Sequence, residues 1–241
     1  HVITITSAMK EELMTRGVPE ECISIAYNSV DPERFVPQPR SQILAAQLGI
    51  PENVPVIGYV GSFVDYEGLD DLVTACVGLK ADGHDFRLLL VGDGAVFEDL
   101  KRQVEESGLA DKTIMTGRVP HEMVEEYYSL VDIAPFPRKP WEVCELVSPL
   151  KPYEAMALEK VVVVSSTRAL KEIVTHEQNG LVFAKGDVGD LQGKLAKLFA
   201  DPVRGIELGK AARAWISHQR SWDVAGCSCV KVYACAERLA V

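Results

Sequence analysis

The sequence lacks long hydrophobic runs and an excess of positive charge. Its longest apolar stretches, at 87–92 and 161–164, fall far short of the roughly 20 residues that a helix needs to cross a bilayer. The 25 Lys and Arg residues are outnumbered by 35 Asp and Glu residues, which gives a formal net charge of −10. Because a long nucleic-acid footprint needs a dense cationic surface, the sequence predicts neither a transmembrane helix nor a nucleic-acid-binding protein. A local basic pocket for a small phosphate ligand remains compatible with this charge.

Complete metal-binding and nucleophile motifs are also missing. The six cysteines show no paired metal-ligand spacing, so we expect reduced thiols and no zinc site. No D-x-D pair follows a predicted strand, and no G-x-S-x-G elbow is present. We interpret four histidines as ordinary surface or cap residues, because their spacing indicates neither a metal site nor a triad: His84, His121, His176 and His218.

The glycine motifs of the common nucleotide sites are incomplete. No G-x-x-x-x-G-K-[ST] segment occurs, which excludes a P-loop triphosphate site at the level of sequence. GYVGSF at 58–63 and GDG at 92–94 do not complete G-x-G-x-x-G, and this argues against an NAD site. We interpret the GDG turn as structural, since glycines let a chain leave a strand at φ values that other residues avoid.

An alternation of strands and helices is present instead. Hydrophobic residues make up 47% of the 241 residues, which is enough for a sizeable core. From Pro55 onward, runs rich in Val, Leu and Ile alternate with amphipathic stretches, a pattern typical of a parallel sheet covered by helices on both faces. The fold class is therefore α/β, with a doubly wound parallel sheet. Strands are predicted at 2–6, 22–28, 55–61, 87–94, 112–117, 132–136 and 161–166, and helices at 7–17, 69–83, 96–108, 121–131, 148–158, 169–180, 204–218 and 221–239.

Candidate ligand-binding residues follow the predicted strands. In an open parallel sheet, ligands bind outside the carboxyl ends of the strands, where loops lead into helices. The segments at these ends are Gly61–Ser62, 92–94, Gly117–Arg118, Arg138–Lys139 and Ser148–Lys151. A glycine such as Gly61 also lets a ligand approach the backbone closely.

The segment SPLKPYEAMAL at 148–158 carries the most specific signal. Ser148 is a good N-cap and Pro149 a good first-turn residue, and the free amides of that turn form an anion site with the helix dipole. Two prolines remove donors, which leaves the amides of Leu150 and Lys151.

The side chains of Lys151 and Glu154 fit the same ligand. A lysine beside a helix N-terminus is unfavourable unless an anion is present. Glu154, three residues later, shares its face and can accept from two sugar hydroxyls. Together they describe a nucleoside diphosphate site, and the alternative is a simple Lys–Glu surface pair.

Taken in order, the motifs resemble the carboxyl-terminal, donor-binding half of a family 4 glycosyltransferase with the GT-B architecture. The resemblance covers nearly the whole chain. Its blocks are ITITSAMKEELMTRGVPEECISIAYNSVD, VIGYVGSFVDYEGLDDLV, LLLVGDG, TGRVPHEMVEEYY, DIAPFPR, SPLKPYEAMALEKVVVVSS, LKEIVTHEQNGLVF and the SW at 221–222.

The resemblance implies a role for each candidate residue. Glu154 would hold the donor ribose, the segment Ser148, Pro149, Leu150 and Lys151 would bind the diphosphate, and Arg118 and Val119 would face the nucleobase. Gly61 and Ser62 complete the expected donor site, with Arg138 adding charge. Lys151 and Glu154 are the expected catalytic residues, with no metal and no cofactor beyond the nucleoside diphosphate sugar.

Three positions depart from the family pattern. Ser62 and Glu67 stand where many members have Arg and Lys, and Leu146 stands where most have a glutamate. The sequences at 61–70 and 145–157 resemble those of a subgroup linked to exopolysaccharide and exosortase-type gene clusters. In that subgroup Lys151 and Arg138 would replace the missing positive charges.

The resemblance also implies how the protein is organised and what it does. We expect a donor-binding domain over 1–202, carboxyl-terminal helices over 203–241 that pack on it, and an amino-terminal acceptor domain that is absent from this sequence. The expected function is retaining transfer of a sugar to a glycan or lipid-linked acceptor, in the cytoplasm, with peripheral membrane association left open. The alternatives are a non-catalytic nucleotide-sugar-binding or interaction domain, or a GT-B-like nucleotide-sugar epimerase.

Overall fold

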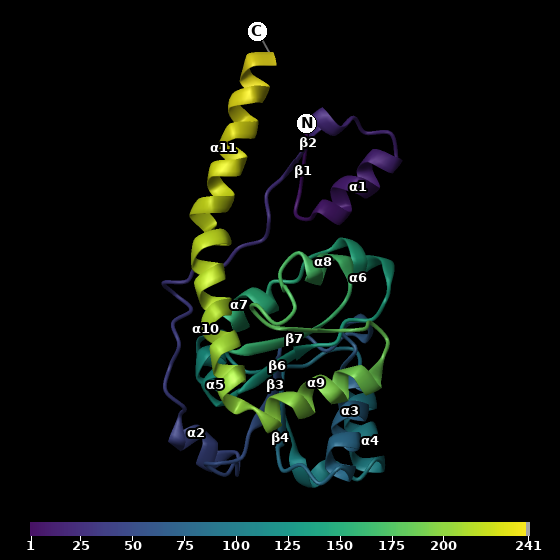
Figure 1. Cartoon of the computed structure of the whole chain (residues 1–241), viewed down its shortest axis with the longest axis vertical. Coiled ribbons are helices and arrows are strands. Elements are labelled where there is room, and N and C mark those ends of the chain that lie inside the picture. The colour runs from purple at the N-terminus through teal and green to yellow at the C-terminus, as the bar shows by residue number, and fades with distance from the viewer. Residues whose placement is uncertain (240–241) are drawn as a thin grey trace.

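The computed structural model describes residues 1–239, with side chains as far as Tyr233 except those of 228 and 231. Its centre is a parallel sheet of order β5-β4-β3-β6-β7-β8, seen in Figure 1 with helices on both sides. The strands are β3 (Val56–Val60), β4 (Arg87–Val91), β5 (Thr113–Gly117), β6 (Ile133–Phe136), β7 (Val161–Ser165) and β8 (Leu181–Phe183). Every residue of β3, β6 and β7 is buried, because helices cover both faces of these central strands. The predicted doubly wound α/β fold is confirmed.

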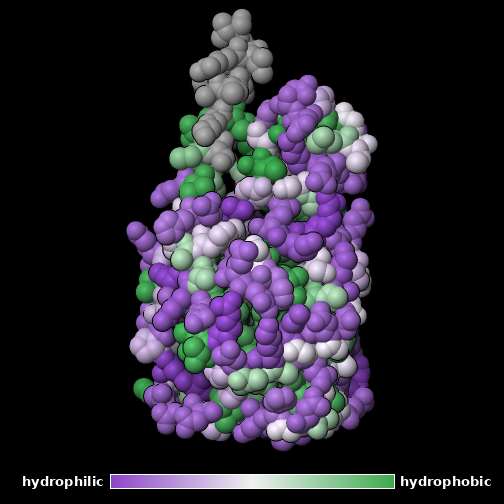
Figure 2. Space-filling view, viewed as in Figure 1, coloured by the Kyte–Doolittle hydropathy of each residue, from purple (hydrophilic) through white to green (hydrophobic). Residues whose placement is uncertain are grey.

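Helices of unequal length connect and flank the strands. α3 packs between α4 and α9 on one side, while α7 contacts β6, β7 and α10. Their bounds are α1 (Ser7–Thr15), α2 (Gln42–Gln47), α3 (Leu69–Ala81), α4 (Phe97–Glu106), α5 (Val124–Leu130), α6 (Glu142–Leu146), α7 (Lys151–Ala157), α8 (Arg168–Lys171), α9 (Val188–Ala200), α10 (Pro202–Gln219) and α11 (Trp222–Leu239). None of the helices, over the described part of the chain, is long and apolar enough to span a membrane. The face seen in Figure 2 is largely polar, with apolar residues in small groups.

Several element boundaries differ from the sequence-based expectation. Thr6, rather than Ser7, caps α1, with its hydroxyl accepting from the amide of Met9. The helix predicted at 169–180 ends at Lys171, and the chain then turns so that His176 and Gly180 form a short bridge before β8. Neither β8 nor α9 was predicted, and α2 lies just after the proline-rich connector at 31–40.

The amino-terminal strands form a separate small sheet. β1 (Val2–Thr4) and β2 (Ile23–Ile25) pair in parallel with each other, and Figure 1 shows them away from the six-stranded sheet. α1 contacts α6 and α8. Glu172 fastens this unit, because its carboxylate accepts from the amides of Ser7 and Ala8 at the start of α1. The helix dipole favours a carboxylate at that end of α1.

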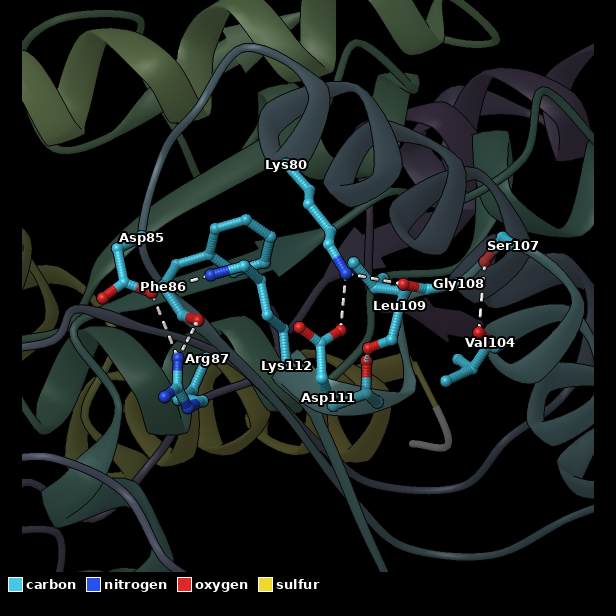
Figure 3. A network of polar contacts seen from close by, with 11 residues as sticks. Lys80, Asp85, Phe86, Arg87, Val104, Ser107, Gly108, Leu109, Asp111 and Lys112 are labelled. Carbon is cyan, nitrogen blue, oxygen red and sulfur yellow. Dashed lines mark hydrogen bonds and ion pairs between the residues drawn. The ribbon is translucent and has the colours of Figure 1, made fainter.

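A network of ion pairs ties the amino ends of β4 and β5 together (Figure 3). Lys80 donates to the carbonyl of Gly108 at 2.7 Å and to Asp111 Oδ1 at 2.6 Å. Asp85 accepts from Lys112 at 2.7 Å and also pairs with a nearby arginine. Both aspartate side chains are 64% exposed, so this is a solvated network.

Candidate functional site

A hollow of about 720 Å³ lies at the carboxyl ends of β3, β4 and β5. Two glycine turns and the segment after β5 line it. The lining residues are Val60, Gly61, Ser62, Val91, Gly92, Asp93, Gly94, Arg118, Val119, Pro120, His121 and Val124. The structure thus places Gly61, Ser62, Arg118 and Val119 of the predicted site around one hollow, at the end of the sheet where parallel folds bind ligands.

The GDG turn is shaped by close packing against the loop after β3. A Cβ atom on Gly92 would lie 1.9 Å from the carbonyl oxygen of Gly61, and one on Gly94 would lie 2.2 Å from that of Phe63. The amide of Phe63 donates to the carbonyl of Asp93 at 2.9 Å. These contacts support the structural interpretation of this turn, since only glycine leaves room for the neighbouring backbone.

The side chain of Lys151 crosses Gly61 at the edge of the hollow, although Lys151 is not one of the lining residues. Gly61 has φ +150°, and a Cβ there would lie 2.1 Å from Cε of Lys151. The ammonium lies 2.9 Å from Glu67 Oε1 and 5.5 Å from the ring centroid of Tyr59. Lys151 therefore pairs with Glu67, so the interpretation as a simple Lys151–Glu154 surface pair is wrong.

Arg138 lies beneath this pair instead of in the hollow. Its side chain is 4% exposed and that of Glu67 3%, with Arg138 Nε 3.8 Å from Glu67 Oε1. Arg138 Nη1 donates to the carbonyl of Val147 at 2.8 Å. Arg138 is thus held under the loop in this structure, and its expected contribution of charge against a diphosphate stays a prediction.

The start of α7 differs from the predicted anion site. α7 begins at Lys151 with Leu150 as an N-cap that makes no side-chain hydrogen bond, so Ser148 and Pro149 lie in the preceding loop. Ser148 is buried, its hydroxyl lies 3.2 Å from the hydroxyl of Tyr153, and its carbonyl accepts from Asn28 Nδ2 at 2.8 Å. Ser148 thus links the loop to neighbouring segments and does not cap the helix, and the helix itself has only seven residues.

Glu154 is a largely buried carboxylate among cations. Burial raises its pKa, and the nearby charges of His121, Lys151 and Arg34 act in the opposite direction. Arg34 Nη2 lies 2.5 Å from His121 Nε2, and His121 also lines the hollow. Tyr128 packs near Glu154 in the core, where burial and then the charge of Glu154 raise the pKa of its hydroxyl.

Sequence reasoning missed two of these residues. His121 was interpreted as an ordinary surface residue. It is exposed, but it lines the hollow and also lies near Glu154. Arg34 lies in the connector at 31–40, whose prolines gave no sign of a site. Only the position of His121, four residues after the end of β5, carried a usable signal.

A second hollow of about 410 Å³ lies between α3, α4 and the loop after β6. It contains Lys139 and the half-exposed Trp141. The ammonium of Lys139 is held 2.8 Å from carboxylate oxygens of both Asp70 and Asp71. The positive charge of Lys139 is therefore compensated by these two aspartates, and Lys139 is not one of the residues that line the first hollow.

Basic side chains and one carboxylate thus lie in or near the first hollow. Arg118, His121 and Lys151 lie in or beside it, and Glu154 is close to the last two. Such a set is able to bind a ligand with both anionic groups and hydroxyls. Among the side chains that the structure describes, no cluster of three or more His, Cys, Asp or Glu residues is arranged to hold a metal ion.

Comparisons with known proteins agree with this geometry. Residues 41–221 match the family described as Glycosyl transferases group 1. The chain is 28% identical over 205 residues to the 2-deoxystreptamine glucosyltransferase of Streptomyces kanamyceticus, covering 84% of this chain and 52% of that protein. It is 28% identical over 225 residues to the GDP-mannose-dependent alpha-(1-6)-phosphatidylinositol monomannoside mannosyltransferase of Mycobacterium tuberculosis, covering 92% of this chain and 58% of that protein.

The solved structures include the same fold. Anabaena HepE in complex with UDP-glucose superposes with a TM-score of 0.84 at 20% identity, over 97% of this chain and 63% of that one. The chain spans only 52% and 58% of the two curated relatives. The chain therefore aligns with only a part of each relative.

Proposed function

Because the chain belongs to the Glycosyl transferases group 1 family, we propose that it is the donor-binding half of a retaining glycosyltransferase that uses a nucleoside diphosphate sugar. The observation that carries this proposal is the hollow at the carboxyl end of the sheet, with Lys151 crossing Gly61 at its edge. Open parallel sheets bind nucleotides outside the carboxyl ends of their strands, which is where this hollow lies.

The proposed assignment follows the charges of the site. The nucleobase lies against Arg118 and Val119, and the ribose hydroxyls donate to Glu154. The diphosphate approaches the backbone of Gly61 and Ser62 and meets the ammonium of Lys151. We assign no direct contact to Arg138 or Ser148, since both are buried.

Lys151 is the proposed source of catalysis within this half. When the sugar is transferred, its C1–O bond to the diphosphate breaks, the electron pair leaves with the diphosphate, and a new bond forms from C1 to the acceptor oxygen. A cation held at the diphosphate stabilises the charge that grows there in the transition state. The proton of the acceptor hydroxyl passes to the oxygen of the departing diphosphate, which received the electron pair of the broken bond.

We assign the acceptor to a second domain outside the present sequence. Support comes from the relatives, of whose length this chain covers 52% and 58%, and from β1, whose residues Val2 and Ile3 are 39% and 40% exposed. A glycan or lipid-linked acceptor is proposed, and one relative bears a name that specifies a phosphatidylinositol mannoside.

Calorimetric titration of the chain with UDP, GDP and ADP tests this proposal. We expect one base to bind best, and we expect Lys151→Ala and Glu154→Ala to weaken that binding. Asp111→Asn, in the network at the other end of the sheet, is the matched control and should bind like the unaltered chain. If a folded chain binds none of the three nucleotides, the proposed donor site is wrong.

A further inference from the structure

We infer that Glu67 is a positioning residue, which holds Lys151 across Gly61 so that its ammonium faces the donor diphosphate; this inference rests on the proposed function. Glu67 ends a short 3-10 turn, Asp65–Glu67, after β3. Lys151 comes from α7, 84 residues further along the chain. The two side chains meet at 2.9 Å beside the hollow.

The burial of Glu67 is difficult to explain as surface pairing. A carboxylate that is 3% exposed is costly to desolvate unless partners compensate its charge. Lys151 at 2.9 Å and Arg138 at 3.8 Å both compensate Glu67 Oε1. Glu67 Oε2 and Arg138 Nε nevertheless have no hydrogen-bond partner in the described part of the chain. A pair kept only for stability would be expected to satisfy these atoms.

The side chain of Lys151 runs over Gly61 and beside Tyr59. The absence of a side chain at Gly61 opens the space that Lys151 Cε occupies, and Tyr59 lies under the ammonium. The Lys151 side chain is still 21% exposed, so it remains accessible from solvent. A lysine held in its binding orientation loses less conformational entropy when the ligand arrives.

The charges of the cluster make the inference testable. Glu67 contributes one negative charge, and Lys151 and Arg138 contribute two positive ones. If long-range electrostatics alone determined the affinity, removal of the negative charge of Glu67 should strengthen anion binding. A positioning role predicts the reverse, because a released Lys151 is no longer held at the diphosphate.

A double-mutant cycle separates these roles. The variants are Glu67→Gln, Lys151→Met and both together, titrated with the nucleoside diphosphate that the unaltered chain binds best and with its parent nucleoside. We expect Glu67→Gln to weaken diphosphate binding about tenfold, and to change it less than about twofold in the Lys151→Met background. Nucleoside binding should be unchanged in all variants, since it involves no phosphate.

Each other outcome contradicts the inference. Tighter or unchanged diphosphate binding by Glu67→Gln, or an equal loss in the Lys151→Met background, would mean that Glu67 does not act through Lys151. Loss of nucleoside binding would assign Glu67 a purely structural role. If Glu67→Gln does not fold, Glu67→Asp takes its place, with a smaller loss expected. If the unaltered chain binds no nucleoside diphosphate, the proposed function fails, and this inference with it.

Discussion

Two clusters of charged side chains lie at opposite ends of the sheet and are built in different ways. At the amino ends of β4 and β5, Lys80 and Lys112 pair with two aspartates, as Figure 3 shows. The side chains of these aspartates are 64% exposed. At the carboxyl ends, Lys151 pairs with Glu67, which is 3% exposed, and buried polar atoms remain without partners. The same residue types thus fasten loops in one place and, in the function proposed above, prepare a binding site in the other.

The difference lies in what surrounds the charges. In the first cluster, hydrogen bonds from Lys112 and Lys80 lower the pKa values of Asp85 and Asp111, as expected for satisfied, solvated pairs. In the second, Gly61 provides room for the lysine, and the nearby Glu154 has a pKa raised by burial. Perturbed titration beside a hollow is typical of functional sites.

The largest expected effect comes from filling the space at Gly61. Gly61→Val would place atoms where Lys151 Cε lies and would strain a backbone at φ +150°, so we expect nucleoside diphosphate affinity to fall by about 100-fold or more. The matched control is Gly193→Ala in α9, where nothing lies within 4 Å of an added Cβ. That control should bind normally and gain about 0.5–1 kcal/mol in unfolding free energy. Normal affinity in Gly61→Val would contradict the proposed path of Lys151.

The next effect is the loss of the lysine itself. Lys151→Met should weaken diphosphate binding by about 30-fold, and it should lower the free energy of unfolding by about 2 kcal/mol. The buried Glu67 would then keep only the longer 3.8 Å contact with Arg138. Lys112→Met removes the same group from the solvated network at the other end of the sheet. It should leave affinity within about twofold, as measured by calorimetry beside chemical denaturation.

A smaller, pH-dependent effect is expected at Glu154. Its folded pKa is raised above 4.5 by burial, so ionisation costs stability as pH rises from about 4.5 through the folded pKa, and the cost is complete above it. Glu154→Gln should therefore raise the melting temperature slightly at neutral pH and lose this advantage in acid.

Donor binding should respond to Glu154 in the opposite sense. It should weaken as pH falls and the carboxylate takes up a proton, since a neutral carboxyl accepts less well. This dependence should be reduced in Glu154→Gln, whose affinity should be lower at neutral pH. An identical pH profile of affinity in both proteins would remove the ribose role from Glu154.

The smallest effect should come from Asp111→Asn. Its carboxylate is exposed and bonds to Lys80 at 2.6 Å, and exposed pairs contribute little to stability. We expect unchanged nucleotide affinity and a melting temperature close to that of the unaltered chain. A marked loss of binding would show that the two ends of the sheet are coupled.

The sequence predicted the elements with strong local patterns. Buried Val, Leu and Ile runs predicted β3, β4 and β7, and the carboxyl ends of the predicted strands β3 and β5 predicted the place of Gly61 and Arg118. The three-residue β8 was missed because it is short and follows a turn instead of a long helix.

The contacts between side chains of the site could not be predicted from the sequence, because they join residues that are far apart along the chain. Glu67 and Lys151 are 84 residues apart, and nothing local shows that a charged residue after a strand turns inward, as Arg138 does. The start of α7 depends on partners of Ser148 from Asn28 and Tyr153. The domain limits at 202 and 203 and the exopolysaccharide subgroup stay predictions.

A crystal structure of the chain with its best-bound nucleoside diphosphate tests the central claim most directly. The account predicts a phosphate oxygen within hydrogen-bond distance of Lys151 Nζ, ribose hydroxyls at Glu154 and the base beside Arg118 and Val119, with Glu67 still bonded to Lys151. A nucleotide bound elsewhere, or phosphates that leave Lys151 untouched, would contradict it.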